Sequence, residues 1–153
     1  MQIDASTYPT FADAIAVAET VKYTTGSTLY LPGNVVAYDG DGLTLPHNTQ
    51  MYGDGGTSHI SGRMNIGSVL GMQKISTIRF EDGLNVQDAR NTLFEALTFQ
   101  GTVTFAGASY YNTFNTCRWI CGESCWRNSA KYSPVTTRLS CSLRSSPALS
   151  SSA

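Results

Sequence analysis

Residues 75–80 (Ile-Ser-Thr-Ile-Arg-Phe), 94–99 (Phe-Glu-Ala-Leu-Thr-Phe) and 114–119 (Phe-Asn-Thr-Cys-Arg-Trp) share one pattern, apolar-x-x-apolar-x-apolar, at intervals of 19 and 20 residues. A shorter pattern, apolar-x-apolar, recurs at intervals of 21, 20 and 19 residues in the segments 43–45, 64–66, 84–86 and 103–105. The two patterns therefore stay in step along the chain. Self-similarity at about 20 residues is typical of one small structural unit that stacks on the next.

Alternating apolar residues in such short runs indicate strands with one buried face. Two or three strands per period, with Gly, Asn and Asp between them, predict an all-β solenoid: a right-handed parallel β-helix of about 20 residues per coil. A leucine-rich repeat has a similar period, but its dense leucine signature and asparagine ladder are absent from this sequence. Coils stack ~4.8 Å apart, so equivalent side chains should form columns. The expected inward columns are Leu43, Met64, Leu84 and Val103; Leu45, Ile66, Val86 and Phe105; Ile78, Leu97 and Cys117; and Phe80, Phe99 and Trp119.

Residues 11–21 are expected to form an amphipathic helix, because Phe11, Ile15 and Ala18 fall on one helical stripe. Thr10 and Asp13 have the spacing of a capping box, with Asp where Glu is usual. A β-helix has an open end with unpaired strand edges, and a helix lying across that end protects it. We therefore expect an N-terminal capping helix. An ordinary α+β fold explains such a helix but not the register that follows it.

Composition changes near residue 120. From Ser124 onward there are ten serines in thirty residues, and a further coil finds only Tyr132, Val135 and Leu139 as apolar candidates. We expect residues 1–120 to hold the capping helix and the β-helix coils, and residues 121–153 to form a last irregular coil and a Ser-rich tail of the same domain. Two interpretations of this tail stay open: an irregular covering of the C-terminal end, or a shortened or frame-altered version of a longer β-helix. We favour the second, because a Ser-rich segment buries an open core poorly.

Length and charge limit the classes of partner. The 153 residues suit one domain, and a net charge of −1 with 14% charged residues gives no electrostatic basis for binding nucleic acid or a membrane. No apolar run approaches the roughly 20 residues of a membrane helix, and the first residues do not resemble a signal peptide. No Ser-His-Asp order and no phosphate-binding glycine loop is present, so we expect no cofactor.

The cysteines cluster in the last quarter of the chain and do not predict a metal site. Cys117 falls in an inward column, where we expect it to act as a small buried hydrophobic residue. The only histidines, His47 and His59, are distant from the cysteines in sequence. A disulfide between Cys121 and either Cys125 or Cys141 stays undecided.

Three segments, residues 8–15 (Tyr-Pro-Thr-Phe-Ala-Asp-Ala-Ile), 26–33 (Gly-Ser-Thr-Leu-Tyr-Leu-Pro-Gly) and 43–55, resemble the entry to the β-helix of phage tailspikes, within the pectate-lyase-like superfamily. The resemblance covers roughly residues 7–120 and comprises a capping helix, a strand that ends in Pro-Gly and a Gly-rich turn. It implies a virion tail protein, extracellular after release and without a signal peptide, that forms homotrimers and recognises bacterial surface polysaccharide. The alternatives are a polysaccharide lyase or glycoside hydrolase of the tailspike type, and a structural fragment of a longer β-helix without its own ligand.

Glu95 is the most informative acidic residue, because the repeat aligns it with Ser76 and Asn115 on the outward side of the predicted sheet. Two arginines lie in a neighbouring outward column, and two tyrosines lie in the adjoining corner. The predicted saccharide-binding residues are Arg79, Glu95, Asn115, Arg118, Tyr110 and Tyr111. Glycoside hydrolysis needs two carboxylates roughly 5 to 10 Å apart, whereas Asp39, Asp41, Asp54, Glu81 and Asp82 stand in predicted turns. Glu95 is therefore the single catalytic candidate, and we expect binding without turnover. The alternative for this face is a solvated surface, or a surface buried between subunits.

Overall fold

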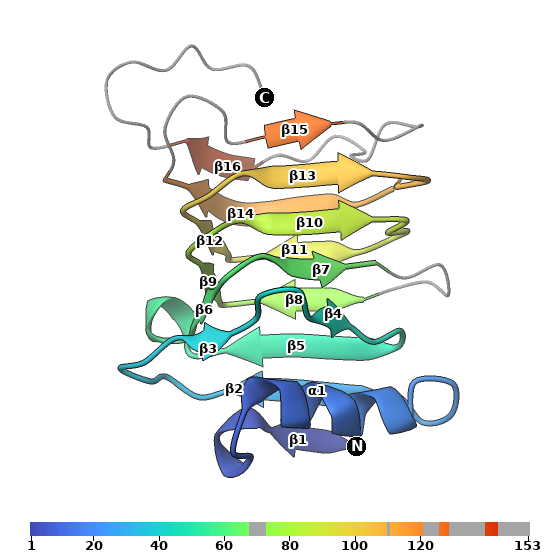
Figure 1. The fold of residues 1–153 in the computed structure, drawn as a ribbon. Coiled ribbons are helices and arrows are strands. Elements are labelled where there is room, and N and C mark those ends of the chain that lie inside the picture. The colour runs from blue at the N-terminus through green and yellow to red at the C-terminus, as the bar shows by residue number, and fades with distance from the viewer. Residues whose placement is uncertain (68–72, 110, 121–125, 129–139, 144–153) are drawn as a thin grey trace.

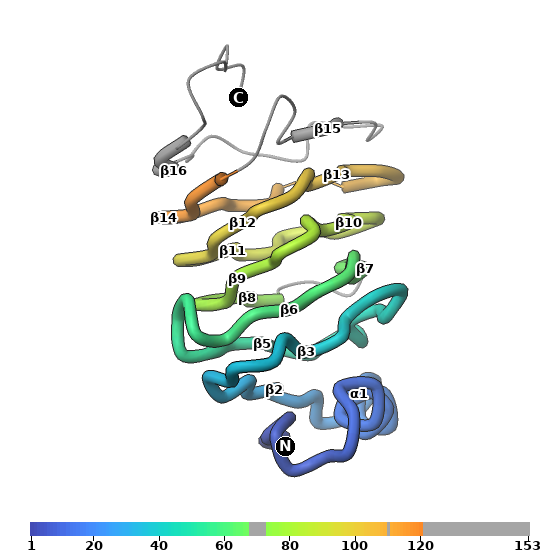
Figure 2. The backbone as a smooth tube through the Cα atoms, turned by 60° about the vertical axis from the view of Figure 1, so that its left-hand side comes forward, coloured from blue at the N-terminus to red at the C-terminus, as the bar shows by residue number. Residues whose placement is uncertain are grey.

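The computed structural model describes residues 1–67, 73–109 and 111–120, together with the backbone of residues 126–128 and 140–143. Figures 1 and 2 show a right-handed parallel β-helix whose coils follow the chain from the N-terminal to the C-terminal end of the stack. Every strand pair among the described residues is parallel. The fold class expected from the repeat is confirmed.

The short strands of successive coils form three ladders along the axis. The first ladder comprises β1 (Gln2–Asp4), β2 (Ser27–Leu31), β5 (Thr49–Gly53), β8 (Lys74–Ser76), β11 (Leu93–Glu95) and β14 (Thr113–Trp119). The second comprises β3 (Tyr38–Asp39), β6 (His59–Ser61), β9 (Arg79–Phe80) and β12 (Thr98–Phe99), and it joins the first because β14 pairs with both β11 and β12. The third comprises β4 (Thr44–Leu45), β7 (Met64–Ile66), β10 (Leu84–Gln87), β13 (Val103–Ala106) and β15 (Trp126–Asn128).

The predicted columns are rungs of these ladders. Leu84 pairs with Met64 on one side and with Val103 on the other, and all three side chains are buried. The pairing of β12 with β9 and β14 places Leu97 between Ile78 and Cys117, also buried. Leu43, at the end of its column, is only partly buried.

Aromatic side chains in adjacent coils stack inside the upper half of the helix. The rings of Phe94 and Phe114 lie 4.4 Å apart between centroids and are nearly parallel, at 6°. Phe99 stacks with Phe80 at 5.7 Å and with Trp119 at 5.1 Å. In-register stacking holds each coil at a fixed rotation on its neighbour, because a shifted coil loses both the ring contacts and the ladder hydrogen bonds.

A corner made without glycine separates the first ladder from the second. Thr77, Ala96 and Thr116 occupy equivalent positions in successive coils, with φ values of 54°, 51° and 52°. Their left-handed backbone turns the chain while the ladder continues, since the N–H groups of Thr77 and Ala96 donate to the carbonyls of Glu95 and Asn115. Sequence patterns did not reveal this corner, because residues other than glycine rarely adopt positive φ.

A polar column inside the core was also not anticipated. Ser27 pairs with Thr49, and their hydroxyls lie 3.1 Å apart. Higher in the stack, the amide of Gln73 donates to the carbonyl of Pro46, and Asn112 donates to the carbonyl of Ala89. The buried members of this column are Ser27, Thr49, Gln73, Thr92 and Asn112. Gln73 and Asn112 thus satisfy main-chain groups at the corner where the first ladder begins, whereas the buried Thr92 hydroxyl has no partner among the described residues.

The N-terminal cap has the predicted geometry. Helix α1 (Phe11–Thr20) begins at the N-cap Thr10, whose hydroxyl accepts from the Asp13 N–H while the Asp13 carboxylate accepts from the Thr10 N–H. The helix ends at Thr20, with Val21 as its C-cap rather than its last residue. Figure 1 shows α1 at the N-terminal end of the stack, beside β1. Strand β1 was not predicted, because a three-residue strand is too short to show a period.

The ladders extend into the Ser-rich region. Strand β15 pairs with β13, and β16 (Ser140–Leu143) pairs with β14. The sequence patterns predicted neither strand. The three apolar candidates for a further coil, Tyr132, Val135 and Leu139, lie outside the described residues. So do Cys121, Cys125 and the side chain of Cys141, whereas the thiol of Cys117 is buried and lies 3.3 Å from the carbonyl oxygen of Phe94.

Candidate functional site

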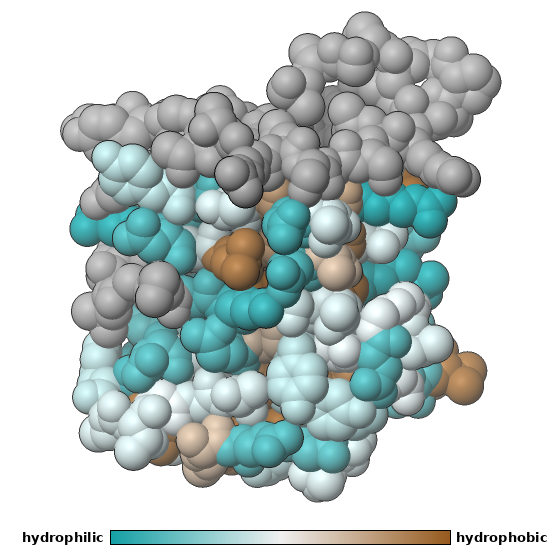
Figure 3. All heavy atoms as spheres, turned by 180° about the vertical axis from the view of Figure 1, so that it is seen from behind, coloured by the Kyte–Doolittle hydropathy of each residue, from teal (hydrophilic) through white to brown (hydrophobic). Residues whose placement is uncertain are grey.

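Two outward columns flank the corner at Thr77, Ala96 and Thr116, and we call them together the corner face. The first column holds Ser76, Glu95 and Asn115, paired in register through β8, β11 and β14. The second column holds Arg79, Thr98 and Arg118, paired through β9, β12 and the end of β14. The structure thus brings four of the predicted binding residues, Arg79, Glu95, Asn115 and Arg118, to one corner. Figure 3, seen from behind the view of Figure 1, shows that this side of the molecule is largely hydrophilic, with hydrophobic side chains only in small separate patches.

Glu95 is held as an anion. Its Oε2 lies 2.6 Å from Nζ of Lys74, which stands one coil lower on the outward side of the sheet. The hydrogen bond and the charge of Lys74 lower the pKa of Glu95, and a hydrogen bond with Asn115 lowers it further, while partial desolvation opposes them. Sequence reasoning missed Lys74. The register could have indicated it: Ser76 pairs with Glu95, and Lys74 lies two residues before Ser76, so Lys74 is a diagonal neighbour of Glu95 on the adjacent strand.

The lowered pKa limits the chemistry open to Glu95. A general acid must be protonated near neutral pH, which requires a raised pKa, so this carboxyl is unsuited to donate a proton to a leaving group. An anion in this position can accept hydrogen bonds from sugar hydroxyls, or attack if a second carboxyl assists. The Glu81 carboxylate is engaged elsewhere, since its Oε1 lies 2.5 Å from His59 Nδ1 and 3.4 Å from Arg79 Nη2.

The aspartates of the predicted turns bind main-chain N–H groups. Asp54 accepts from the Gly33 N–H and from the hydroxyl of Tyr30, and Asp82 accepts from the Gly62 N–H at 2.6 Å. Asp39 accepts from the Asp41 N–H, and Asp41 accepts from the Arg63 N–H. These carboxylates serve the turns between strands, which agrees with the structural role expected from their Asp-Gly sequences.

The arginine column is only partly neutralised. Arg79 makes the long contact with Glu81, and its buried Nε has no acceptor. Arg118 is exposed and forms no ion pair within the described residues. Thr98 lies between the two arginines in register, and its hydroxyl has no hydrogen-bond partner in the described part of the chain. Arg118 and the Thr98 hydroxyl are therefore available to a ligand, whereas Arg79 is only partly exposed.

Tyr111 lies two residues before β14 and four positions before Asn115, and 58% of its surface is exposed. Its φ of 57° belongs to a turn rather than to an extended strand, and it lies outside the paired rungs of the two columns. Tyr111 is thus at the edge of the corner face rather than inside it. Tyr110, the other predicted tyrosine, lies outside the described residues.

A second pair of tyrosines was missed. Tyr30 and Tyr52 pair in register lower in the first ladder, and their rings stack at 4.9 Å and 23°. Their faces are turned to each other, and their hydroxyls bond to Asp54 and Gln2. The pair therefore stabilises the stack and occupies one face of each ring.

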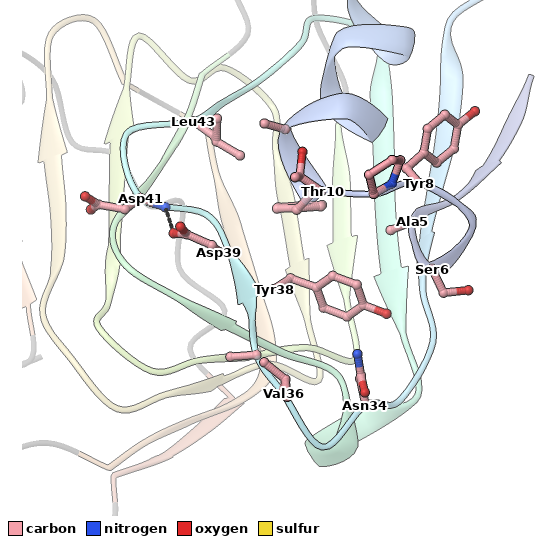
Figure 4. A pocket seen from close by; sticks show the side chains of 14 residues that line it. Ala5, Ser6, Tyr8, Thr10, Asn34, Val36, Tyr38, Asp39, Asp41 and Leu43 are labelled. Carbon is pink, nitrogen blue, oxygen red and sulfur yellow. Dashed lines mark hydrogen bonds between the residues drawn. The ribbon is translucent and has the colours of Figure 1, made fainter.

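A pocket of about 540 Å³ lies between the start of α1 and the chain around β3 (Figure 4). Phe11 and Tyr38, both nearly buried, belong to its lining, together with Asp39 and Asp41. Figure 4 shows the Asp41 carboxylate turned away from the pocket and the Asp39 carboxylate turned toward the Asp41 N–H. Because its polar groups do not converge, we assign no ligand to this pocket.

Within the described ranges, no group of three or more His, Cys, Asp and Glu side chains is placed to hold a metal ion. The one α-helix of that part of the chain, α1, is too short to cross a membrane. A scan against protein-family models and searches of curated proteins and of solved structures found no match to this chain.

Proposed function

We propose that this chain is a tailspike- or tail-fibre-like β-helix module that recognises bacterial surface polysaccharide through the corner face. The observation that carries the proposal is the register of Glu95 with Asn115 beside the register of Arg79 with Thr98 and Arg118. Adjacent rungs, ~4.8 Å apart, present carboxylate, amide, hydroxyl and guanidinium groups in a row along the axis. A sugar chain offers hydroxyl and ring-oxygen partners along its length, so an extended row of fixed polar groups suits it.

The surrounding structure keeps this row rigid. Each outward side chain of the corner face has an inward neighbour that is buried, such as Phe94 beside Glu95 and Phe99 beside Thr98. A backbone fixed by a packed core loses little further freedom when a ligand binds, which favours affinity. The resemblance to tailspikes also implies a place and an oligomeric state. We propose that the chain belongs to a phage tail, acts outside the cell and forms a homotrimer.

We expect binding without cleavage. Glu95 has a lowered pKa and its ion-pair partner is a lysine, so the described residues give it no acidic partner for glycoside hydrolysis.

The test is a panel of bacterial surface polysaccharides, scored for binding and for new reducing or unsaturated ends. Glu95→Gln should weaken binding, because it removes the charge and keeps the shape. The matched control is Glu19→Gln, which breaks the Glu19–Lys22 ion pair on α1, away from the corner face. Binding unchanged in Glu95→Gln contradicts this site. Cleavage lost in Glu95→Gln favours the enzyme alternative, cleavage that survives it eliminates Glu95 as catalytic, and no binding across the panel favours a structural fragment.

A further inference from the structure

Charge is divided along the axis of the β-helix. Residues 1–62 contain six acids and one base, a net charge of −5, and residues 63–153 contain five acids and nine bases, a net charge of +4, which together give the −1 of the chain. A solenoid converts position in the sequence into position along its axis, and Figure 1 shows the described coils in that order. Within the part of the chain that the structure describes, residues 63–120 contain four acids and five bases, a net charge of +1, so the acidic excess lies at the N-terminal end and the upper part of the stack is close to neutral.

The corner face lies in the upper part. Its bases and acids are mostly paired, Lys74 with Glu95 and Arg79 with Glu81. Arg118, at the top of the second column, is the exposed base there with no acidic partner in the described ranges. Two coils below it in the column, Arg79 still has a buried Nε without an acceptor. The column thus presents a guanidinium at each end and the Thr98 hydroxyl between them.

We propose that the second column binds the acidic groups of an anionic saccharide, a carboxylate or a phosphate held between Arg118 and Arg79 with the Thr98 hydroxyl as a third donor. This inference rests on the proposed function and specifies the ligand class of the same face. Guanidinium groups suit it because they donate two parallel hydrogen bonds to carboxylate or phosphate oxygens. The first column, where Glu95 is an anion, contacts neutral hydroxyl groups of the same saccharide.

A nucleic acid fits this column less well. Binding to DNA or RNA depends on many phosphate contacts from a continuous basic surface. Here the column has only two bases, Arg79 and Arg118, and the neighbouring Lys74 and Arg79 already pair with Glu95 and Glu81, so the surface is not continuously basic. A saccharide with one acidic group in several sugar units can place that group at the arginines and its hydroxyls at the acids.

The experiment uses the full chain and compares one polysaccharide in its acidic and neutral forms with two polymers that carry phosphate. The probes are polygalacturonate, its carboxyl-reduced form, a glycerol-phosphate teichoic acid, a single-stranded oligonucleotide, and each panel polysaccharide that binds. The variants are Arg118→Ala, Arg118→Lys and Thr98→Val, with Lys22→Ala as control because it removes one positive charge from the acidic end. Circular dichroism of each variant verifies that the β-helix is intact.

We expect an acidic polysaccharide to bind at least tenfold more tightly than its neutral form, and more weakly as salt is added. Arg118→Ala should reduce that affinity about tenfold and Arg118→Lys should recover only part of it, whereas Lys22→Ala should have no effect. Polygalacturonate and teichoic acid distinguish a carboxylate from a phosphate as the preferred anion. Equal binding of acidic and neutral forms overturns this inference and leaves the proposed function standing. Absence of binding to every polysaccharide overturns both, and equal or tighter binding of the oligonucleotide identifies a nonspecific polyanion surface instead.

Discussion

Truncation of Leu97 to alanine should destabilise the β-helix strongly, while the same change at its neighbour Thr98 should not. Leu97 is 1% exposed and lies on the rung between Ile78 and Cys117. Three buried carbon atoms are lost, which at about 0.8 kcal/mol per methylene amounts to about 2.4 kcal/mol of transfer free energy. A cavity term is added, because hydrogen-bonded coils above and below cannot collapse into the space. The expected total is about 3–4 kcal/mol, within the usual range for such changes.

Thr98 points outward by strand alternation, so Thr98→Ala should cost less than about 0.5 kcal/mol. Both free energies of unfolding can be measured by urea denaturation followed by far-UV circular dichroism, provided the slopes of the transitions agree. Similar losses in the two variants would refute the strand phase on which the whole register depends. A small loss in Leu97→Ala alone would show that the coils can relax into the cavity.

Three further predictions concern positions outside that rung. Arg63 donates to the Asn85 side chain, to the carbonyls of Asp82 and Leu84, and to the Thr104 hydroxyl. Arg63→Lys keeps the charge but loses most of these bonds, so it should lower the free energy of unfolding in urea by about 1–3 kcal/mol. Ala96 has a φ of 51°, which glycine adopts without strain, so Ala96→Gly should raise the melting temperature. Ala106→Gly, in strand β13, should lower it, and a change of the melting temperature in the same direction for both variants would contradict the corner geometry. The pKa of Glu95 is lowered chiefly by Lys74, so its ion pair should stabilise the fold above the ordinary glutamate pKa of about 4.3 and be lost only as pH falls through the lower folded value. Carbon-detected NMR titration should show this, and Lys74→Gln should return the Glu95 pKa toward its ordinary value.

The sequence predicted those parts of the fold in which apolar side chains repeat. Leu84 and Leu97 were placed correctly because burial leaves a periodic signal, and α1 was predicted because Thr10 and Asp13 form its cap. Strand β5 was missed as a rung, because Met51 precedes its partner Ile75 by 24 residues, longer than the period seen elsewhere. A loop of variable length at a corner changes the spacing without changing the rung.

The candidate site was predictable only as far as register determines it. The alignment of Glu95 with Asn115, and of Arg79 with Arg118, follows from the apolar residues beside them. The ion pair of Glu95 with Lys74 joins adjacent columns diagonally, so no single column indicates it. Ion pairs on a surface depend on rotamers and on the length of the side chain, and neither is periodic.

A β-helix separates the residues that determine its fold from those that can bind a ligand. Inward positions such as Phe94 and Phe114 must match their neighbours above and below, whereas the outward Glu95 and Asn115 between the same strands need only tolerate theirs. Outward residues are therefore free to vary, and an outward feature that costs stability needs a reason beyond the fold. Arg79 has such a cost, because its buried Nε lacks an acceptor. A bound anion that drew the guanidinium outward would remove this cost in stability. If Arg79→Met stabilises the chain and weakens binding of the acidic polysaccharide, the arginine serves the ligand. If Arg79→Met instead destabilises the chain, the contact of Arg79 with Glu81 serves the fold.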